Sequence, residues 1–432
     1  MFRTISNLMR VADIRKKIVF TLLMLVVFRI GTFIPVPYTN KDAIDFMNQQ
    51  NVFGFLNTFG GGALQNFSIL AMGIMPYITA SIIMQLLQMD VVPTFAEWRK
   101  QGEMGRRKLA QVTRYGTVVL AFVQGIGMSI GFNAMAGGML IENPNFVKII
   151  VIALVLTAGT TFLMWLGEQI TEHGVGNGIS IIIFAGIVAG VPNGVKQLYS
   201  QYLMNPGDDL FINIVIVALI LLVILAVTVG VIYIIQAERK IPIQYAKRLV
   251  NHRSPVGGQS THLPLKVNAA GVIPVIFAIA FIAAPRTIAS FWEGNKVANV
   301  IEMIFDYTQP IGMIIYVILI IAFTYFYTFV QVNPETMAEN LQKQGGYIPG
   351  IRPGRNTQTY LTRVLYRLTF VGSIFLATVS VLPIFLGGVA NLPQAVQIGG
   401  TSLLIVVGVA LQTMKQLEGQ LVKRHYRGFI RS

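Results

Sequence analysis

The side chains that could carry out chemistry in this chain are few, and their types and positions argue against catalysis. The chain has no cysteine, so a thiolate nucleophile and a cysteine-ligated metal are excluded. It also lacks an H-E-x-x-H zinc motif, a pair of aspartates within an apolar stretch and a P-loop, which are signatures of proteases and ATPases. Its four histidines all lie in connecting segments: His173, His252, His262 and His425. We therefore expect no catalytic residue, no metal site, no cofactor and no enzymatic activity.

One charged side chain, Arg29, lies within the long apolar stretches, which otherwise contain no Asp, Glu, Lys, Arg or His. Ion-coupled transporters generally use ionisable groups inside the membrane. This composition argues against that class, although unwound backbone could still bind Na⁺. We expect Arg29 to be structural, either reaching the membrane surface or pairing with a backbone carbonyl or an acidic side chain of another loop.

The overall composition is that of a membrane protein. Of the 432 residues, 54% are apolar and only 12% are charged, and the mean hydropathy is +0.64. A soluble globular chain carries about 25% charged residues. The basic start followed by an apolar stretch could pass for a signal peptide, but no small-residue cleavage site follows it. We interpret this stretch as a first transmembrane helix that is retained.

Nine apolar stretches approach or exceed the roughly 20 residues that a helix needs to cross a bilayer. They are residues 18–34, 67–89, 115–132, 149–166, 210–237, 267–285, 310–332, 368–390 and 398–414. A tenth, 179–191, is too short alone and completes a span only if the glycine-rich residues 174–178 also enter the membrane, surrounded by protein or water. We expect an all-α polytopic membrane protein with ten transmembrane helices.

The basic residues are sorted between the two sides of these spans. If the N-terminus is cytoplasmic, the cytoplasmic segments hold 27 of the 33 Lys and Arg residues. The opposite side holds five, which are Lys41, Lys148, Lys196, Arg286 and Lys296. Cytoplasmic loops carry the excess of positive charge in membrane proteins. The sequence therefore predicts that both termini are cytoplasmic.

Ten spans divide into two sets of five, within residues 1–200 and 201–432. An odd number of spans per half means that any structural repeat is inverted in the membrane, an arrangement that places a functional site near the midplane between the halves. The cytoplasmic loops at about 238–266 and 333–367 are long and basic. With the basic C-terminal tail (Lys415, Lys423, Arg424, Arg427 and Arg431) they favour a large cytoplasmic partner, although a long basic loop can also be only a topology signal.

Five motifs in fixed order resemble those of the SecY/Sec61-alpha family, the channel subunits of the protein-conducting translocon. They are residues 73–81 (GIMPYITAS), 164–170 (MWLGEQI) with 176–180 (GNGIS), 259–268 (QSTHLPLKVN), 348–354 (IPGIRPG) and 399–405 (GGTSLLI). The resemblance runs from the first span to the tail. It implies two inverted, pseudo-symmetric halves that form a clamshell around an hourglass pore, with a short half-helix, the plug, closing the outer side.

The resemblance places the plug at about 55–67, before the second span. The residues that it implicates are Asn57, Thr58, Phe59, Gly60, Gly61, Gly62, Ala63 and Leu64. Three consecutive glycines are poor helix formers and suit a segment that moves, but without the resemblance an ordinary flexible loop is the favoured interpretation.

The resemblance also implies a ring of aliphatic side chains at the constriction of the pore. Its members are Ile74, Ile78, Ile179, Ile183, Ile276 and Ile405. The first four form two pairs that are four residues apart, so each pair shares a helix face. A narrow apolar collar blocks ions by losing its water. From spacing alone, packing between helices or against lipid is the simpler interpretation.

Two further groups follow from the resemblance. Gln85 and Asn177 lie near a lateral gate, where the second and third spans meet the seventh and eighth and signal sequences leave into lipid; each could also merely bridge helices. Arg352, in the turn 349–354, is implied to dock a partner, and Lys240, Lys247 and Arg248 match a second contact region. Contacts of these cations with ribosomal RNA would weaken with salt.

The function implied is a passive, gated channel that moves unfolded secretory polypeptides across the bacterial cytoplasmic membrane and inserts membrane proteins laterally. The implied partners are the subunits SecE and SecG, the motor ATPase SecA, the ribosome, signal sequences and nascent polypeptides, and membrane lipids. The competing class is a polytopic solute transporter or lipid flippase.

Overall fold

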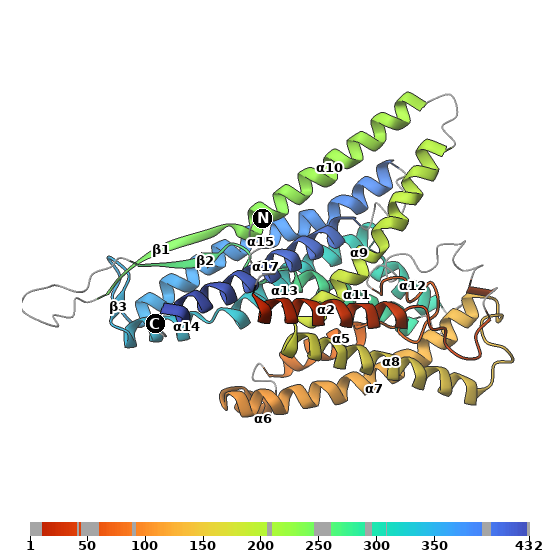
Figure 1. Ribbon diagram of the computed structural model, residues 1–432, viewed down its shortest axis with the longest axis horizontal. Helices are drawn as coiled ribbons and strands as arrows, with labels where there is room; N and C mark the ends of the chain where they lie inside the picture. Colours follow the sequence, from red (N-terminus) through yellow and green to blue (C-terminus); the bar gives the residue numbers. More distant parts are fainter. Residues whose placement is uncertain are drawn as a thin grey trace, which may run out of the picture.

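The computed structural model describes residues 11–40, 43–44, 60–88, 92–204, 210–245, 261–289, 296–307, 309–390 and 399–429. These residues form a bundle of long helices with a small sheet at one end (Figure 1). The helices that overlap the ten predicted spans are α2 (Ala12–Gly31), α5 (Met75–Leu87), α7 (Glu103–Met135), α8 (Phe146–His173), α9 (Gly178–Tyr199), α10 (Leu210–Gln236), α11 (Ile273–Ala289), α13 (Pro310–Gln331), α15 (Arg355–Ala390) and α17 (Gly399–Phe429). The prediction of a helical, multi-span fold is confirmed.

Shorter elements occupy the connections between these helices. They are α6 (Pro93–Lys100), a π-helix at Ser200–Met204, α12 (Lys296–Phe305) and α14 (Pro334–Lys343), with the strands β1 (Glu238–Tyr245), β2 (Thr261–Lys266) and β3 (Gly346–Tyr347). Figure 1 shows α6, α14 and the sheet at one end of the molecule and α12 at the other. The connecting segments that carry many of the basic residues thus lie at one end of the molecule.

The outer surface of the bundle is apolar. Six of the described helical segments are long and apolar enough to span a membrane. The most apolar of them, Phe211–Gln236 in α10, has only 11% of its apolar window buried within the chain, and Phe211, Leu222 and Leu225 are well exposed. An apolar surface of this extent is stable only against lipid or another protein.

The fifth span corrects one prediction. We expected residues 179–191 to need the lead-in 174–178 to complete a span, but α9 runs through Pro192 to Tyr199 and reaches 22 residues. A proline inside a helix removes one hydrogen bond and usually kinks or ends it; here the helix continues past it. Residues 174–176 are buried against neighbouring helices, yet the length of the span comes from its other end.

Two helices join the first half of the chain to the second. In Figure 1, α2, α5, α7 and α8 lie on one side of the bundle, and α10, α13, α15 and α17 on the other. Helix α11 packs against α5 and α7 as well as α13, and α9 packs against α8 and α17. The side chains between these helices form the largest apolar core of the described chain.

The two long loops that are predicted to be cytoplasmic fold together rather than separately. Strand β1, in the first loop, pairs antiparallel with β2 and also with β3 of the second loop, through Gln244 and Tyr347. Below this sheet, Ile241 and Ile243 pack with Leu341 and Leu361 in a separate apolar cluster. This sheet is an addition to the predicted all-helical fold.

Candidate functional site

The six isoleucines of the predicted ring lie in one apolar core at the junction of the two halves. Ile74, Ile78, Ile183, Ile276 and Ile405 are buried there, and Ile179 is half-buried and packs against it. They come from four different helices or their ends, α5, α9, α11 and α17. The structure therefore brings together residues that are up to 331 positions apart in the sequence.

A small cavity lies beside three of these isoleucines. Its volume is about 20 Å³, and it is lined by Ile78, Ile183, Gly60 and residues 71–75. A cavity of this size holds about one water molecule. Nothing as wide as a polypeptide fits between the isoleucines and the chain segment that precedes α5.

This segment, residues 60–74, is a run of consecutive turns that we call the turn segment. Five residues of the predicted plug, Gly60, Gly61, Gly62, Ala63 and Leu64, belong to it, and four of the five are buried. The other three, Asn57, Thr58 and Phe59, lie outside the described residues. The described part of the plug is built of turns and not of a half-helix.

The turn segment is hydrogen-bonded to residues 32–36, which follow the end of α2. The backbone amide of Val36 donates to the carbonyl of Phe67 at 3.0 Å, and that of Ile69 donates to Ile34 at 2.9 Å. The side-chain amide of Asn66 donates to the carbonyl of Thr32 at 3.1 Å. These bonds fix the middle of the turn segment in the bundle.

Glycines in the surrounding helices make room for the turn segment. A Cβ atom on Gly159 of α8 would lie 1.8 Å from the carbonyl oxygen of Ile69, and one on Gly31 of α2 would lie 2.5 Å from the side chain of Leu70. Because the atom met at Gly159 is a backbone oxygen, α8 approaches the segment at backbone distance there, whereas at Gly31 the side chain of Leu70 fills the space that a Cβ would take. Nothing in the sequence pattern indicates that these two glycines pack against a loop far from them in the chain.

Gly159→Ala should destabilise the chain by about 1–3 kcal/mol, because the added methyl group overlaps a backbone carbonyl that cannot turn away. The measurement is thermal unfolding of the purified chain in detergent. Gly230→Ala in α10 is the matched control, since its Cβ would meet nothing within 4 Å. Equal unfolding temperatures of the two variants would contradict the packing described here.

Arg29 takes one of the two roles predicted for it. Its guanidinium donates a hydrogen bond to the carbonyl oxygen of Gly61 in the turn segment and lies over the ring of Phe33, with 4.8 Å between Cζ and the ring centroid. It therefore pairs with a backbone carbonyl, and within the described residues no acidic side chain forms an ion pair with it.

The two residues predicted at a lateral gate have different surroundings. Gln85 lies on α5, which packs against α11; its amide nitrogen donates to Ser81 at 3.4 Å, and its buried oxygen has no protein partner in the described chain. Asn177 is exposed and caps α9, since its side-chain oxygen accepts from the amides of Ile179 and Ser180. The structure thus gives Asn177 a local capping role, while Gln85 lies on a helix of the α5–α11 contact.

The predicted docking residues are exposed where they are described. Arg352 lies in a tight turn between Gly350 and Gly354, both with positive φ, and its backbone carbonyl accepts from Thr357 at 3.0 Å. Lys240, on β1, lies 3.8 Å from Glu238 in an exposed ion pair. Lys247 and Arg248 lie outside the described residues. Because β1 pairs with β3, the structure places both described docking residues on one small domain.

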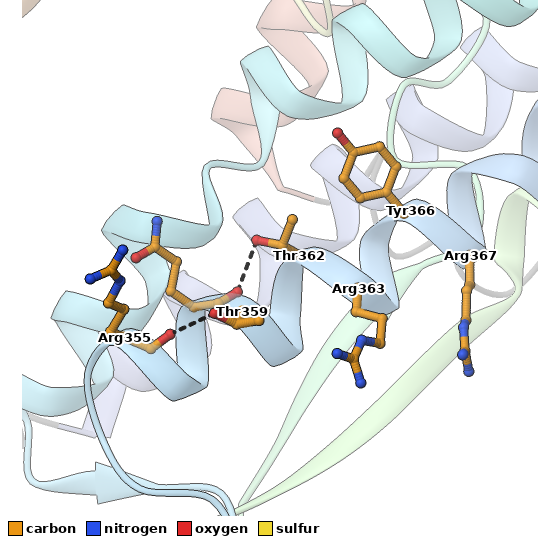
Figure 2. Close-up of a pocket in the computed structure, with 7 residues that line it drawn as sticks. Arg355, Thr359, Thr362, Arg363, Tyr366 and Arg367 are labelled. Atoms are coloured by element: carbon orange, nitrogen blue, oxygen red, sulfur yellow. Dashed lines mark hydrogen bonds between the residues drawn. The ribbon is translucent and has the colours of Figure 1, made fainter.

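The first turns of α15 add cations that the sequence analysis did not single out. Arg355, Arg363 and Arg367 line an open hollow of about 620 Å³ with Gln358, Thr359, Thr362 and Tyr366. Figure 2 shows Arg363 and Arg367 projecting to the same side of the helix. No salt bridge to these arginines occurs among the described residues. The three arginines and Thr359 follow one another at intervals of four residues, so they share one face of the helix. This spacing could have been recognised in the sequence.

The comparisons with known proteins agree with this architecture. The protein translocase subunits SecY of Halalkalibacterium halodurans and Bacillus subtilis are each 69% identical to this chain over the full length of both proteins. A solved protein-conducting channel shares its fold with a TM-score of 0.60 at 20% identity, covering 94% of this chain and 93% of that one. Sec61 from a canine ribosome–channel complex gives a TM-score of 0.60 at 19% identity, covering 94% and 93%. The sequence model of the SecY family matches residues 68–414, and this chain belongs to that family.

Proposed function

We propose that this chain is the pore-forming subunit of a protein translocase, a passive gated channel for unfolded polypeptides. The observation that carries the proposal is the shared apolar core that holds the isoleucines of four helices, with the turn segment packed beside Ile78 and Ile183. The family, with its relatives named protein translocase subunits, supports the same function.

The isoleucine ring and the turn segment would seal the resting channel by two different means. An apolar constriction excludes ions because water leaves it, and the turn segment fills the space beside it. Aliphatic side chains can yield around a passing chain without offering it a specific binding site. For a polypeptide to pass, the turn segment has to leave the position that it occupies here.

Sideways release into lipid would occur where α11 meets α5 and α7. These contacts join the two halves of the chain, so their separation opens the bundle without unfolding either half. The unpartnered amide oxygen of Gln85 lies on one of the helices concerned. A polar group of this kind weakens the packing of a helix contact in an apolar environment, which suits a contact that must open.

The energy for transport would come from partners that dock on the basic face, which is the exposed surface carrying Lys240, Arg352, Arg355, Arg363 and Arg367. This face can bind an anionic partner through the side chains of Arg352, Lys240 and the arginines of α15. We propose no enzymatic site on it that could release the energy for transport. Two of the structural neighbours are ribosome-bound channels, one of canine Sec61 and one of yeast Ssh1. We infer that this face docks a ribosome or the motor ATPase SecA, that SecE and SecG complete the channel, and that the chain resides in the cytoplasmic membrane with both termini inside.

Reconstitution decides between this function and a solute transporter or lipid flippase. The chain is placed in liposomes with SecE and SecG, and SecA, ATP and a secretory precursor are added outside. We expect the precursor to become protected from protease. If it remains digestible while the liposomes move a small solute or a lipid instead, the translocase function is wrong.

A further inference from the structure

The hydrogen bond between Arg29 and Gly61 joins the only charged side chain of the predicted spans to the loop that closes the predicted pore. Arg29 lies in the last turn of α2 and is half-buried. A guanidinium is always charged and carries five N–H donors, so its position in an apolar span is costly unless those donors are used. The presence of a cation at such a site therefore indicates a role other than filling space.

The bond holds one particular end of the turn segment. The backbone bonds to residues 32–36 fix its middle, from Asn66 to Ile69. Arg29 instead binds the glycine end, and the neighbouring Gly60 lines the cavity beside Ile78 and Ile183. The contact with Arg29 is thus next to a residue that packs beside the isoleucines, as residues 71–74 at the other end of the segment also do.

The geometry of Gly61 explains why its carbonyl can reach the guanidinium. Gly61 has φ +64, in the left-handed region that glycine adopts without strain. A Cβ at this position would lie 3.0 Å from the Cα of Gly186 in α9 and 3.4 Å from the ring of Phe28. The glycine end is therefore pressed between α2 and α9, with its carbonyl turned toward Arg29.

We propose that Arg29 is a positioning residue that holds the glycine end of the turn segment against the isoleucine constriction in the resting channel, through the carbonyl of Gly61. A hydrogen bond from a charged donor is about twice as strong as a neutral one, and it is strongest where water is absent. When the pore opens and fills with water, the guanidinium can be hydrated instead. The bond therefore stabilises the closed state, and in the open state hydration of the guanidinium replaces it.

This inference rests on the proposed channel function, but it can be tested by a measurement that does not depend on ion sealing. Because the chain has no cysteine, a single thiol can be introduced at Ala63, which is fully buried in the turn segment. The full chain with SecE and SecG is placed in lipid nanodiscs, and the rate of reaction of Ala63→Cys with a membrane-impermeant maleimide is measured.

Replacing Arg29 by Leu should raise this rate roughly tenfold, as expected for the loss of one charge-assisted hydrogen bond. Arg29→Lys should give an intermediate rate, because an ammonium keeps the charge but not the planar arrangement of donors. Lys16→Leu, which removes an exposed charge from the same helix, should leave the rate unchanged. An unchanged rate in Arg29→Leu would overturn the proposal.

A second thiol separates this effect from general loosening of the fold. Leu361→Cys in α15 is fully buried in the separate apolar cluster beside the sheet, and it should remain unreactive in the Arg29→Leu background. If it also becomes reactive, Arg29 only stabilises the fold and the proposal is wrong. If Ala63→Cys reacts faster while the resting ion conductance does not change, Arg29 holds the segment but the segment is not the seal.

Discussion

Deleting residues 57–66 should make membranes that contain the resting channel leak small ions, with a conductance higher by roughly tenfold or more. The deletion removes Ala63 and Leu64, which are buried, and Gly60, which lines the cavity. What remains is the ring of isoleucines, which narrows the path but no longer has residues 60–66 of the turn segment packed in front of it. The large effect follows because the segment occupies the space that would otherwise connect to the constriction.

The measurement is single-channel conductance in a planar bilayer with no precursor present. A channel that lacks residues 137–138, in the exposed connection between α7 and α8, is the control for the effect of shortening a loop. The control should remain as tight as the unmodified chain. If the deletion of 57–66 is equally tight, these residues are not the seal.

Reversing the charge of Arg352 should reduce precursor translocation by roughly tenfold while the channel still inserts and folds, because the change removes one favourable contact with an anionic partner and adds a repulsive one. Arg352 is exposed at the tip of a turn that the backbone already fixes. Its side chain has no hydrogen-bond or ion-pair partner within the described residues, so the substitution disturbs binding and not the fold.

Initial rates of precursor uptake into liposomes, driven by SecA and ATP, measure this effect. Lys343→Glu on α14 is the matched control. It makes the same charge change at an exposed position in the same loop, where only a weak ion pair with Glu339 is lost. Full uptake by Arg352→Glu would remove this residue from the docking surface.

The bundle could be predicted from the sequence because lipid imposes a simple rule, long apolar stretches separated by charged loops. The rule was less reliable where tertiary contacts decide the outcome. It ended the fifth span at residue 191, although α9 continues through Pro192. It also missed the sheet of the two long loops, although in β1 the apolar Ile241 and Ile243 are buried on either side of the exposed Pro242, in the alternation of a half-buried strand.

The site was predicted through the resemblance and not through spacing. Pairs such as Ile74 and Ile78 share a helix face, but nothing in their spacing indicates that residues of α9, α11 and α17 lie opposite. The partner of Arg29 could not be predicted either. The charge in the span indicated that an acceptor was needed, but only the folded chain shows that Gly61 supplies it, because the close packing of Gly61 against Gly186 depends on three separate segments.

The central claim is that polypeptides pass through the isoleucine constriction, and cross-linking of a translocating chain tests it most directly. A precursor with one thiol is held part-way by a folded C-terminal domain, and single cysteines are placed at Ile183 and Ile276 in the ring or at Leu222 on the exposed face of α10. We expect disulfide adducts at both ring positions and none at Leu222. Adducts at Leu222 but not at Ile183 and Ile276 would contradict the proposed path.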